Sequence, residues 1–161
     1  MGDHSETIQI DYDPTRVSYA ELLELFWRSH RPTSPAWSRQ YMSIIFYHDE
    51  EQKRLAFETK AREAARLGSA IYTEIVPAGR FTWAEDYHQK YYLSHYRDLM
   101  QEVRRIYPTL PAFVNSTAAA RLNGYAGGNG SKAQLDAELE SLGLSPAASE
   151  EVLRLVSGGL E

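Results

Sequence analysis

Three side chains in the first quarter of the chain could bind or protonate a substrate oxygen. Glu6 follows His4 just ahead of an alternating apolar segment, and a carboxyl group in an apolar pocket can donate a proton to an oxygen that leaves as water. Tyr41 ends a proline-rich loop, where its phenol can hydrogen-bond a substrate, and Trp37 in the same loop can wall a methyl pocket. Taken singly, each is commoner as an exposed acid or a packing aromatic.

A second group of polar side chains lies on a stretch expected to be helical. His88 and His95 stand seven residues apart with Asp86 nearby, but helical zinc pairs use a four-residue step and no third ligand is evident. We therefore predict no metal site and no cofactor, and expect His4, Asp86 and His88 to support the site. The glycine-rich loop at 124–130 does not follow a strand, so it is a weak nucleotide signal.

Composition excludes several classes of protein. The 161 residues include no cysteine, which rules out disulfides, thiolate zinc sites and thiol chemistry by these residues. A net charge of -5 with scattered basic residues argues against nucleic-acid binding. The polar start and the lack of a long apolar run predict no secretion signal, no membrane segment and a cytoplasmic location.

Apolar periodicity predicts a mixed domain ahead of Pro108. The expected elements, in chain order, are strand 7–11, a helix starting at Ser18, strand 43–47, helix 50–67, strand 70–76 and helix 84–106. Ser18 and Glu21 have the spacing of a capping box, Asp49 can cap the next helix, and Gly68 can end it. This order indicates an α/β or α+β domain with a small sheet covered by helices.

Beyond Pro108 the pattern changes to short helices. We expect a helix at 116–122, the glycine-rich loop at 124–130, and two amphipathic helices with Ser131 and Ser145 as N-caps and Gly143 between them. The predicted domains are therefore residues 1–107, and a helical C-terminal extension with a glycine-rich loop over 108–161.

Several separated motifs together are more specific than any single residue. In chain order they are Gly2–Glu6, Tyr12–Pro14, Ser18–Leu23, Phe26-Trp27, Arg39–Ser43, Tyr47–Lys53 and Ala84–Gln89. Over about residues 3–92 this set resembles the A-class peptide-methionine (S)-S-oxide reductases. The resemblance implies an α+β sandwich with a ferredoxin-like sheet covered by helices.

The resemblance also implies a reaction. In this family a cysteine thiolate attacks the sulfur of methionine S-sulfoxide, and the resulting sulfenic acid is reduced by a thiol. The family's proton-donating acid falls on Glu6 and its oxygen-binding tyrosine on Tyr41, with Trp37 expected to contact substrate. The implied partners are oxidised proteins or methionine sulfoxide as substrate, and thioredoxin or another thiol as reductant, in the repair of oxidative damage.

Three departures from the family pattern limit what the 161 residues can do. The family's Gly-Cys-Phe-Trp box and a second pocket tyrosine would both precede Met1, so we expect an N-terminally incomplete domain that is inactive alone. Pro35–Ser38 stands where many members have an aspartate. Ala126, within Gly124–Gly127, stands where many members have a recycling cysteine.

Two other functions remain open on the sequence. The chain could be a non-catalytic module that binds methionine sulfoxide or a peptide, with part of the pocket retained. It could also be an interaction scaffold whose helical tail is the working surface. Loss of sulfoxide binding in Glu6→Ala would separate the module from the scaffold.

Overall fold

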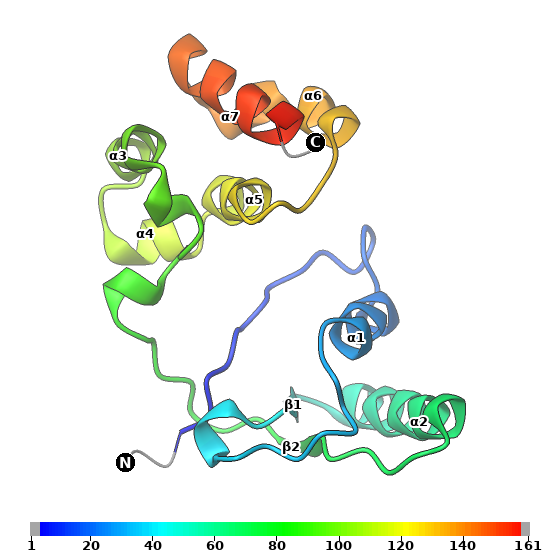
Figure 1. Ribbon diagram of the computed structural model, residues 1–161. Helices are drawn as coiled ribbons and strands as arrows, with labels where there is room; N and C mark the ends of the chain where they lie inside the picture. Colours follow the sequence, from blue (N-terminus) through cyan, green and yellow to red (C-terminus); the bar gives the residue numbers. More distant parts are fainter. Residues whose placement is uncertain (1–3, 159–161) are drawn as a thin grey trace. The chain divides into compact units, whose positions relative to one another are not determined.

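The computed structural model describes residues 4–158, and contacts divide the chain between Phe81 and Thr82 into two compact units. The first unit contains helices α1 and α2 with strands β1 and β2, and the second contains α3 to α7 (Figure 1). Gly2 and Asp3, which begin the first family motif, lie outside the described residues. The domain boundary expected after residue 107 stays a prediction.

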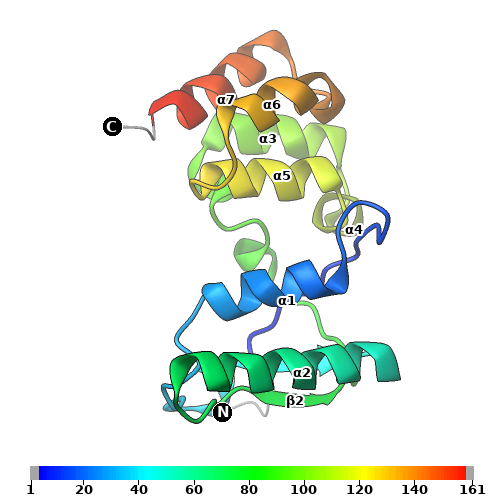
Figure 2. The ribbon, with the colours of Figure 1, turned by 90° about the vertical axis from the view of Figure 1, so that its right-hand side faces the viewer.

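The first unit is built on a small parallel sheet. Strand β1 (Ile44–Tyr47) pairs with β2 (Glu74–Pro77), so that Ile45 lies opposite Ile75. Helix α2 (Glu50–Leu67) connects the strands, as a parallel pair requires. Helix α1 (Tyr19–Arg28) runs beside α2 (Figure 2).

The core of the first unit lies between these helices and one face of the sheet. Leu23 and Trp27 of α1 are buried with Ile45 of β1 and Ala56 of α2. Leu23 and Trp27 are four residues apart on one helix face, as the apolar periodicity of α1 predicts. The mixed fold expected from the sequence, α+β with a helical C-terminal region, is confirmed.

Local capping chemistry defines the ends of both helices, as predicted. The Ser18 N–H and hydroxyl each donate to a Glu21 carboxylate oxygen at 2.7 Å, and the Glu21 N–H donates back to the hydroxyl at 3.3 Å. The Asp49 carboxylate accepts from the N–H of Gln52 at 2.7 Å. Gly68 ends α2 with φ 59°, a left-handed conformation that favours glycine.

The strand predicted at 7–11 is wrong. Among the described residues, no backbone hydrogen bond joins 7–11 to another part of the chain, and the nearest one is from the Glu6 N–H to the Gln40 carbonyl, at 2.9 Å. Ile8 and Ile10 are 81% and 52% exposed. Apolar alternation is not sufficient here, because a strand needs a neighbouring strand to pair with.

The strand predicted at 70–76 begins later, at Glu74. The N–H of Tyr72 donates instead to the Pro32 carbonyl at 2.8 Å, and the Thr73 carbonyl accepts from the Lys60 ammonium at 2.6 Å. A loop and a helix side chain therefore satisfy the backbone that the sequence assigned to a strand.

The second unit is helical throughout its regular part. Its elements are η2 (Asp86–His88), η3 (Leu93–His95), α3 (Arg97–Ile106), α4 (Leu110–Val114), α5 (Thr117–Ala126), α6 (Lys132–Glu138), η4 (Leu139–Leu142) and α7 (Pro146–Gly158). One cluster of buried side chains links all of these elements except η2, and within it Leu93, Phe113, Leu122 and Leu135 are fully covered. Helix α7 packs against α3, α5 and α6.

The single helix predicted at 84–106 is wrong. Two short 3-10 turns occupy 86–88 and 93–95, and only Arg97–Ile106 is α-helical. Lys90 adopts φ 53°, and Tyr96 adopts φ -107° and ψ 85°. Neither conformation can continue an α-helix, so the predicted apolar stripe is divided.

The end of the chain follows the predicted capping signals more closely. Ser131 forms a capping box with Gln134, the Ser145 hydroxyl accepts from the Ala148 N–H at 3.3 Å, and Gly143 is left-handed at φ 70°. Helix α5 continues to Ala126, past its predicted end, so the first three residues of the expected glycine loop are helical. Within residues 4–158, no helix is long and apolar enough to cross a bilayer.

Candidate functional site

Glu6 is held against the loop that carries Trp37 and Tyr41. Its carboxylate accepts from the Gln40 side-chain amide at 2.8 Å, and its N–H donates to the Gln40 carbonyl at 2.9 Å. Beside it, the Ser5 hydroxyl donates to the Arg39 carbonyl at 2.9 Å. Residues some 34 positions apart are thus joined by three hydrogen bonds, and the carboxylate itself remains exposed.

Trp37 and Tyr41 form an aromatic pair in the same loop. Their ring centroids lie 4.9 Å apart with an interplanar angle of 33°. The 3-10 turn η1 (Arg39–Tyr41) provides this geometry, because the Tyr41 N–H donates to the Ser38 carbonyl at 3.3 Å. Trp37 is 81% exposed and Tyr41 49% exposed, so both rings are available to a substrate.

Three of the predicted residues of the first unit are therefore linked through one loop. Glu6, Trp37 and Tyr41 come together through Gln40, while His4 is exposed two residues ahead of Glu6. The arrangement presents an acid, a phenol and an apolar ring from two chain segments. Such a set can bind a polar oxygen beside a small apolar group.

Sequence reasoning missed two contributors to this site. Gln40 is a polar loop residue by sequence, and its signals are its place in the motif Arg39–Ser43 and its position immediately before Tyr41. The Ser38 hydroxyl oxygen is buried, and within the described residues it has no hydrogen-bond partner. A buried hydroxyl without a partner is costly, and a substrate group could satisfy it.

Asp86 and His88 lie in the second unit. Asp86 forms an ion pair with Arg104 of α3. His88 Nε2 lies 3.9 Å from a Glu85 carboxylate oxygen, and the centroids of the His88 and Tyr87 rings are 4.2 Å apart. His88 is thus beside an acid of its own turn, and Asp86 is engaged by a different element.

His95 does not join these two residues. Its Nδ1 lies 3.0 Å from the Tyr91 carbonyl, and its ring packs edge-on against the Tyr91 ring at 4.8 Å. Among residues 4–158 no three histidine or carboxylate side chains are grouped so that they could hold a metal ion.

The stretch Gly124–Gly127, which resembles the family's recycling loop, is packed rather than open. Ala126 is the last residue of α5, and the preceding Tyr125 is buried. The Tyr125 hydroxyl donates to a Glu138 carboxylate oxygen at 2.7 Å, and burial raises the pKa of its phenol. Gly130 lies under this ring, since a Cβ there would be 2.6 Å from Tyr125 Cε1.

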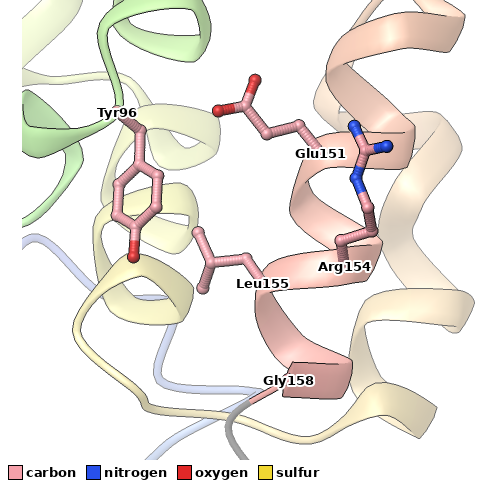
Figure 3. A pocket seen from close by; sticks show the side chains of 5 residues that line it. All are labelled: Tyr96, Glu151, Arg154, Leu155 and Gly158. Atoms are coloured by element: carbon pink, nitrogen blue, oxygen red, sulfur yellow. The ribbon is translucent and has the colours of Figure 1, made fainter.

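The second unit also has a shallow hollow of about 500 Å³. Tyr96 forms one side, and Glu151, Arg154, Leu155 and Gly158 of α7 form the other (Figure 3). None of the side chains predicted to do chemistry lines it. The hollow is therefore separate from the candidate site.

Comparison with known families identifies the family of this chain. Residues 1–122 match the family model described as peptide methionine sulfoxide reductase. Residues 113–156 match the helical domain of selenoprotein methionine sulfoxide reductase A. The chain belongs to the peptide methionine sulfoxide reductase family.

Individual relatives extend the match into the helical region. The chain is 46% identical over 149 residues to a peptide methionine sulfoxide reductase of Drosophila melanogaster, covering 91% of this chain and 59% of the relative. It is 40% identical over 132 residues to peptide methionine sulfoxide reductase A5 of Oryza sativa, covering 78% and 51%. A relative from Methanothermobacter thermautotrophicus is 44% identical over 98 residues, covering 56% and 58%. The chain thus spans between half and six tenths of these relatives.

Proposed function

We propose that this chain forms part of a thiol-dependent reductase of methionine S-sulfoxide in oxidised proteins. The observation that carries the proposal is the double Glu6–Gln40 contact, which brings the acid to the loop of Trp37 and Tyr41. Membership of the reductase family supports it independently. The residues present contain no cysteine, so the attacking thiolate has to come from outside them.

In the proposed reaction the sulfoxide oxygen moves from substrate sulfur to enzyme sulfur. The thiolate attacks the substrate sulfur, a thioether leaves, and the thiol is oxidised by two electrons to a sulfenic acid. Glu6 supplies the proton that the oxygen needs as its bond to the substrate breaks, and the Tyr41 phenol hydrogen-bonds that oxygen. Trp37 covers the substrate methyl group.

A second thiol-dependent step restores the enzyme. Two reducing thiols convert the sulfenic acid to a thiol, with release of water and formation of a disulfide. Because Ala126 cannot form a disulfide, we propose that thioredoxin or another external thiol carries out this step without help from that position. A cytoplasmic location suits the cycle, since thiols are kept reduced there.

The decisive experiment supplies the missing thiolate. A segment carrying the family's Gly-Cys-Phe-Trp box is fused ahead of this chain, and reduction of a peptide containing either epimer of methionine sulfoxide is followed with dithiothreitol. The fusion should reduce the S epimer only, whereas the 161-residue chain should reduce neither. A fused protein that is folded and binds the sulfoxide but never reduces it would favour the non-catalytic module.

Substitutions in the fusion test the assigned roles. Glu6→Gln removes the proton donor and should lower kcat about 10²-fold or more. Tyr41→Phe removes one hydrogen bond to the oxygen and should lower kcat about 10²-fold. Tyr72→Phe, at another exposed tyrosine of the first unit, is the control and should leave kcat unchanged; full activity in Glu6→Gln would exclude Glu6 as the acid.

A further inference from the structure

The segment 84–95 carries a family motif but has little regular structure of its own. It contains two single 3-10 turns separated by the left-handed Lys90. Tyr87 and Tyr91 are 68% and 56% exposed. Short 3-10 turns are weakly stabilised by themselves, so contacts with other elements have to hold this segment in one conformation.

Helix α3 supplies the first such contact. Arg104 forms an ion pair with Asp86, at the start of the segment. The Arg104 guanidinium also lies over the ring of Phe113, 3.9 Å from its centroid, and Phe113 is fully buried. The guanidinium is therefore held by the core on one side while it binds the segment on the other.

Helix α5 supplies a second contact, near the end of the segment. The side-chain oxygen of Asn123 accepts from the Leu93 N–H at 3.2 Å. Leu93 itself is fully buried in the same cluster as Leu122 and Leu135. The backbone at 93 is thus fixed by α5 and its side chain by the helical core.

The C-terminal end of α5 makes the third contact. Gly127 follows the helix, and a Cβ at this position would lie 2.9 Å from Cδ2 of Tyr92. Because that distance is shorter than van der Waals contact, the Tyr92 ring can occupy this place only against a glycine. The observed position of the Tyr92 ring therefore requires that residue 127 has no side chain.

We propose that the helical region, through α3 and α5, positions the motif segment 84–95, with Arg104, Asn123 and Gly127 as positioning residues. The segment 84–95 contains Asp86 and His88, which are expected to support the site. The importance of this positioning for catalysis therefore rests on the proposed function. The match of 113–156 to a helical-domain family model assigns no role to that region. The contacts of Asn123 and Gly127 lie within that region and give it one, which is to maintain, together with Arg104 of α3, the conformation of a segment that belongs to the reductase match.

Amide hydrogen exchange of the full 161-residue chain tests the proposal. Asn123→Ala should raise exchange of the amides of 86–95 about fivefold relative to those of 132–156, because one hydrogen bond to the segment is lost. Asn123→Asp retains an acceptor oxygen and should restore most of the protection. Gly127→Ala should displace the Tyr92 ring, which would be visible as shifted ring resonances.

Glu102→Ala is the matched control. The Glu102 carboxylate accepts from the N–H and hydroxyl of Ser145, at 2.5 and 2.7 Å, so it is a polar contact of the same unit outside the segment. It should raise exchange around α7 and leave 86–95 unchanged. The proposal is overturned if Glu102→Ala raises amide exchange of 86–95 as much as Asn123→Ala does. It is also overturned if Asn123→Asp fails to restore protection. These exchange measurements do not depend on turnover. An inactive fusion protein would therefore contradict the proposed function but not this proposal.

Discussion

A contact between two exposed side chains organises the candidate site. Glu6 and Gln40 are joined by their side chains and also by their backbones, and the backbone bond remains when either side chain is shortened. Hydrogen bonds between exposed groups contribute little to global stability. The contribution of Gln40 should therefore be local, restricting the carboxylate to the loop of Tyr41.

The Gln40 contact gives a prediction at this scale. Gln40→Ala should raise amide exchange at Glu6 two- to threefold, on the order of the loss of one weak hydrogen bond, with no change in the unfolding midpoint. Nuclear magnetic resonance exchange rates measure the effect. Gln9→Ala, which removes another exposed glutamine, should leave the Glu6 amide unchanged; an unprotected Glu6 amide in the native protein would contradict the contact.

At the scale of elements, the capping box of α1 makes part of its stability depend on pH. Hydrogen bonds from the N–H and hydroxyl of Ser18 hold the pKa of Glu21 below its ordinary value of 4.5. A lowered folded-state pKa stabilises the fold at pH values above the unfolded pKa, and this contribution is lost as the pH falls through the folded pKa.

Glu21→Ala should therefore differ from the native chain most at neutral pH. The pH-dependent part of the difference in unfolding free energy should be fully present above pH 4.5 and should shrink as the pH falls below that value. Urea unfolding at pH 6 and pH 3, followed by helical circular dichroism, measures it. Glu24→Ala, on an exposed position of the same helix, is the control and should show no such pH dependence. If the unfolding free energy of Glu21→Ala differed from that of the native chain by the same amount at every pH, the capping box would not be the cause of the pH dependence.

Substitution by alanine should have opposite effects on stability at two glycines, Gly68 and Gly124. Gly68 caps α2 at φ 59°, while Gly124 lies inside α5 with open space around it and is not among the positive-φ glycines. Gly68→Ala should destabilise the first unit by about 1 kcal/mol, because alanine is strained in the left-handed region. Gly124→Ala should stabilise the second unit by about 0.5–1 kcal/mol, since alanine favours helix.

Denaturant unfolding of the two variants measures these changes. Circular dichroism reports both changes. Tryptophan fluorescence includes the signal of Trp27, which is buried in the first unit, whereas Trp37 and Trp83 are exposed. Destabilisation by both substitutions would mean that the Gly124 position does not tolerate a side chain. Stabilisation by Gly68→Ala would contradict the left-handed cap.

At the scale of the whole molecule, the two units have unequal cores. Among the described residues, twelve buried side chains form the cluster of the second unit and four form that of the first. Burial of apolar surface is the main favourable term in folding. The second unit should therefore be the more stable one.

Limited proteolysis tests this difference. Arg80 is exposed in a stretch without regular structure, at the end of the first unit. Trypsin should cut there early, leave a resistant fragment that begins at Phe81, and degrade the first unit further. Mass spectrometry identifies the products. Early cuts within α3, α5 or α7 would contradict the predicted order of stability.

The sequence alone predicted features whose causes lie within a few residues. The capping box at Ser18, the Asp49 cap and the left-handed Gly68 were identified because each depends on short-range hydrogen bonds or on one residue's dihedral angles. Family membership was likewise recognisable, since it rests on motifs in order along the chain. The catalytic roles of Glu6 and Tyr41 stay predictions.

Only the tertiary structure decided the features that depend on distant partners. Residues 7–11 have strand periodicity, but no strand of the described residues 4–158 pairs with them. The stretch 84–106 has helical periodicity but is divided near Lys90 and Tyr96. The contact of Glu6 with Gln40 and that of Leu93 with Asn123 span about 30 residues each. Periodicity indicates which side chains prefer to be buried, whereas packing and hydrogen bonding between distant segments decide which backbone conformation satisfies them.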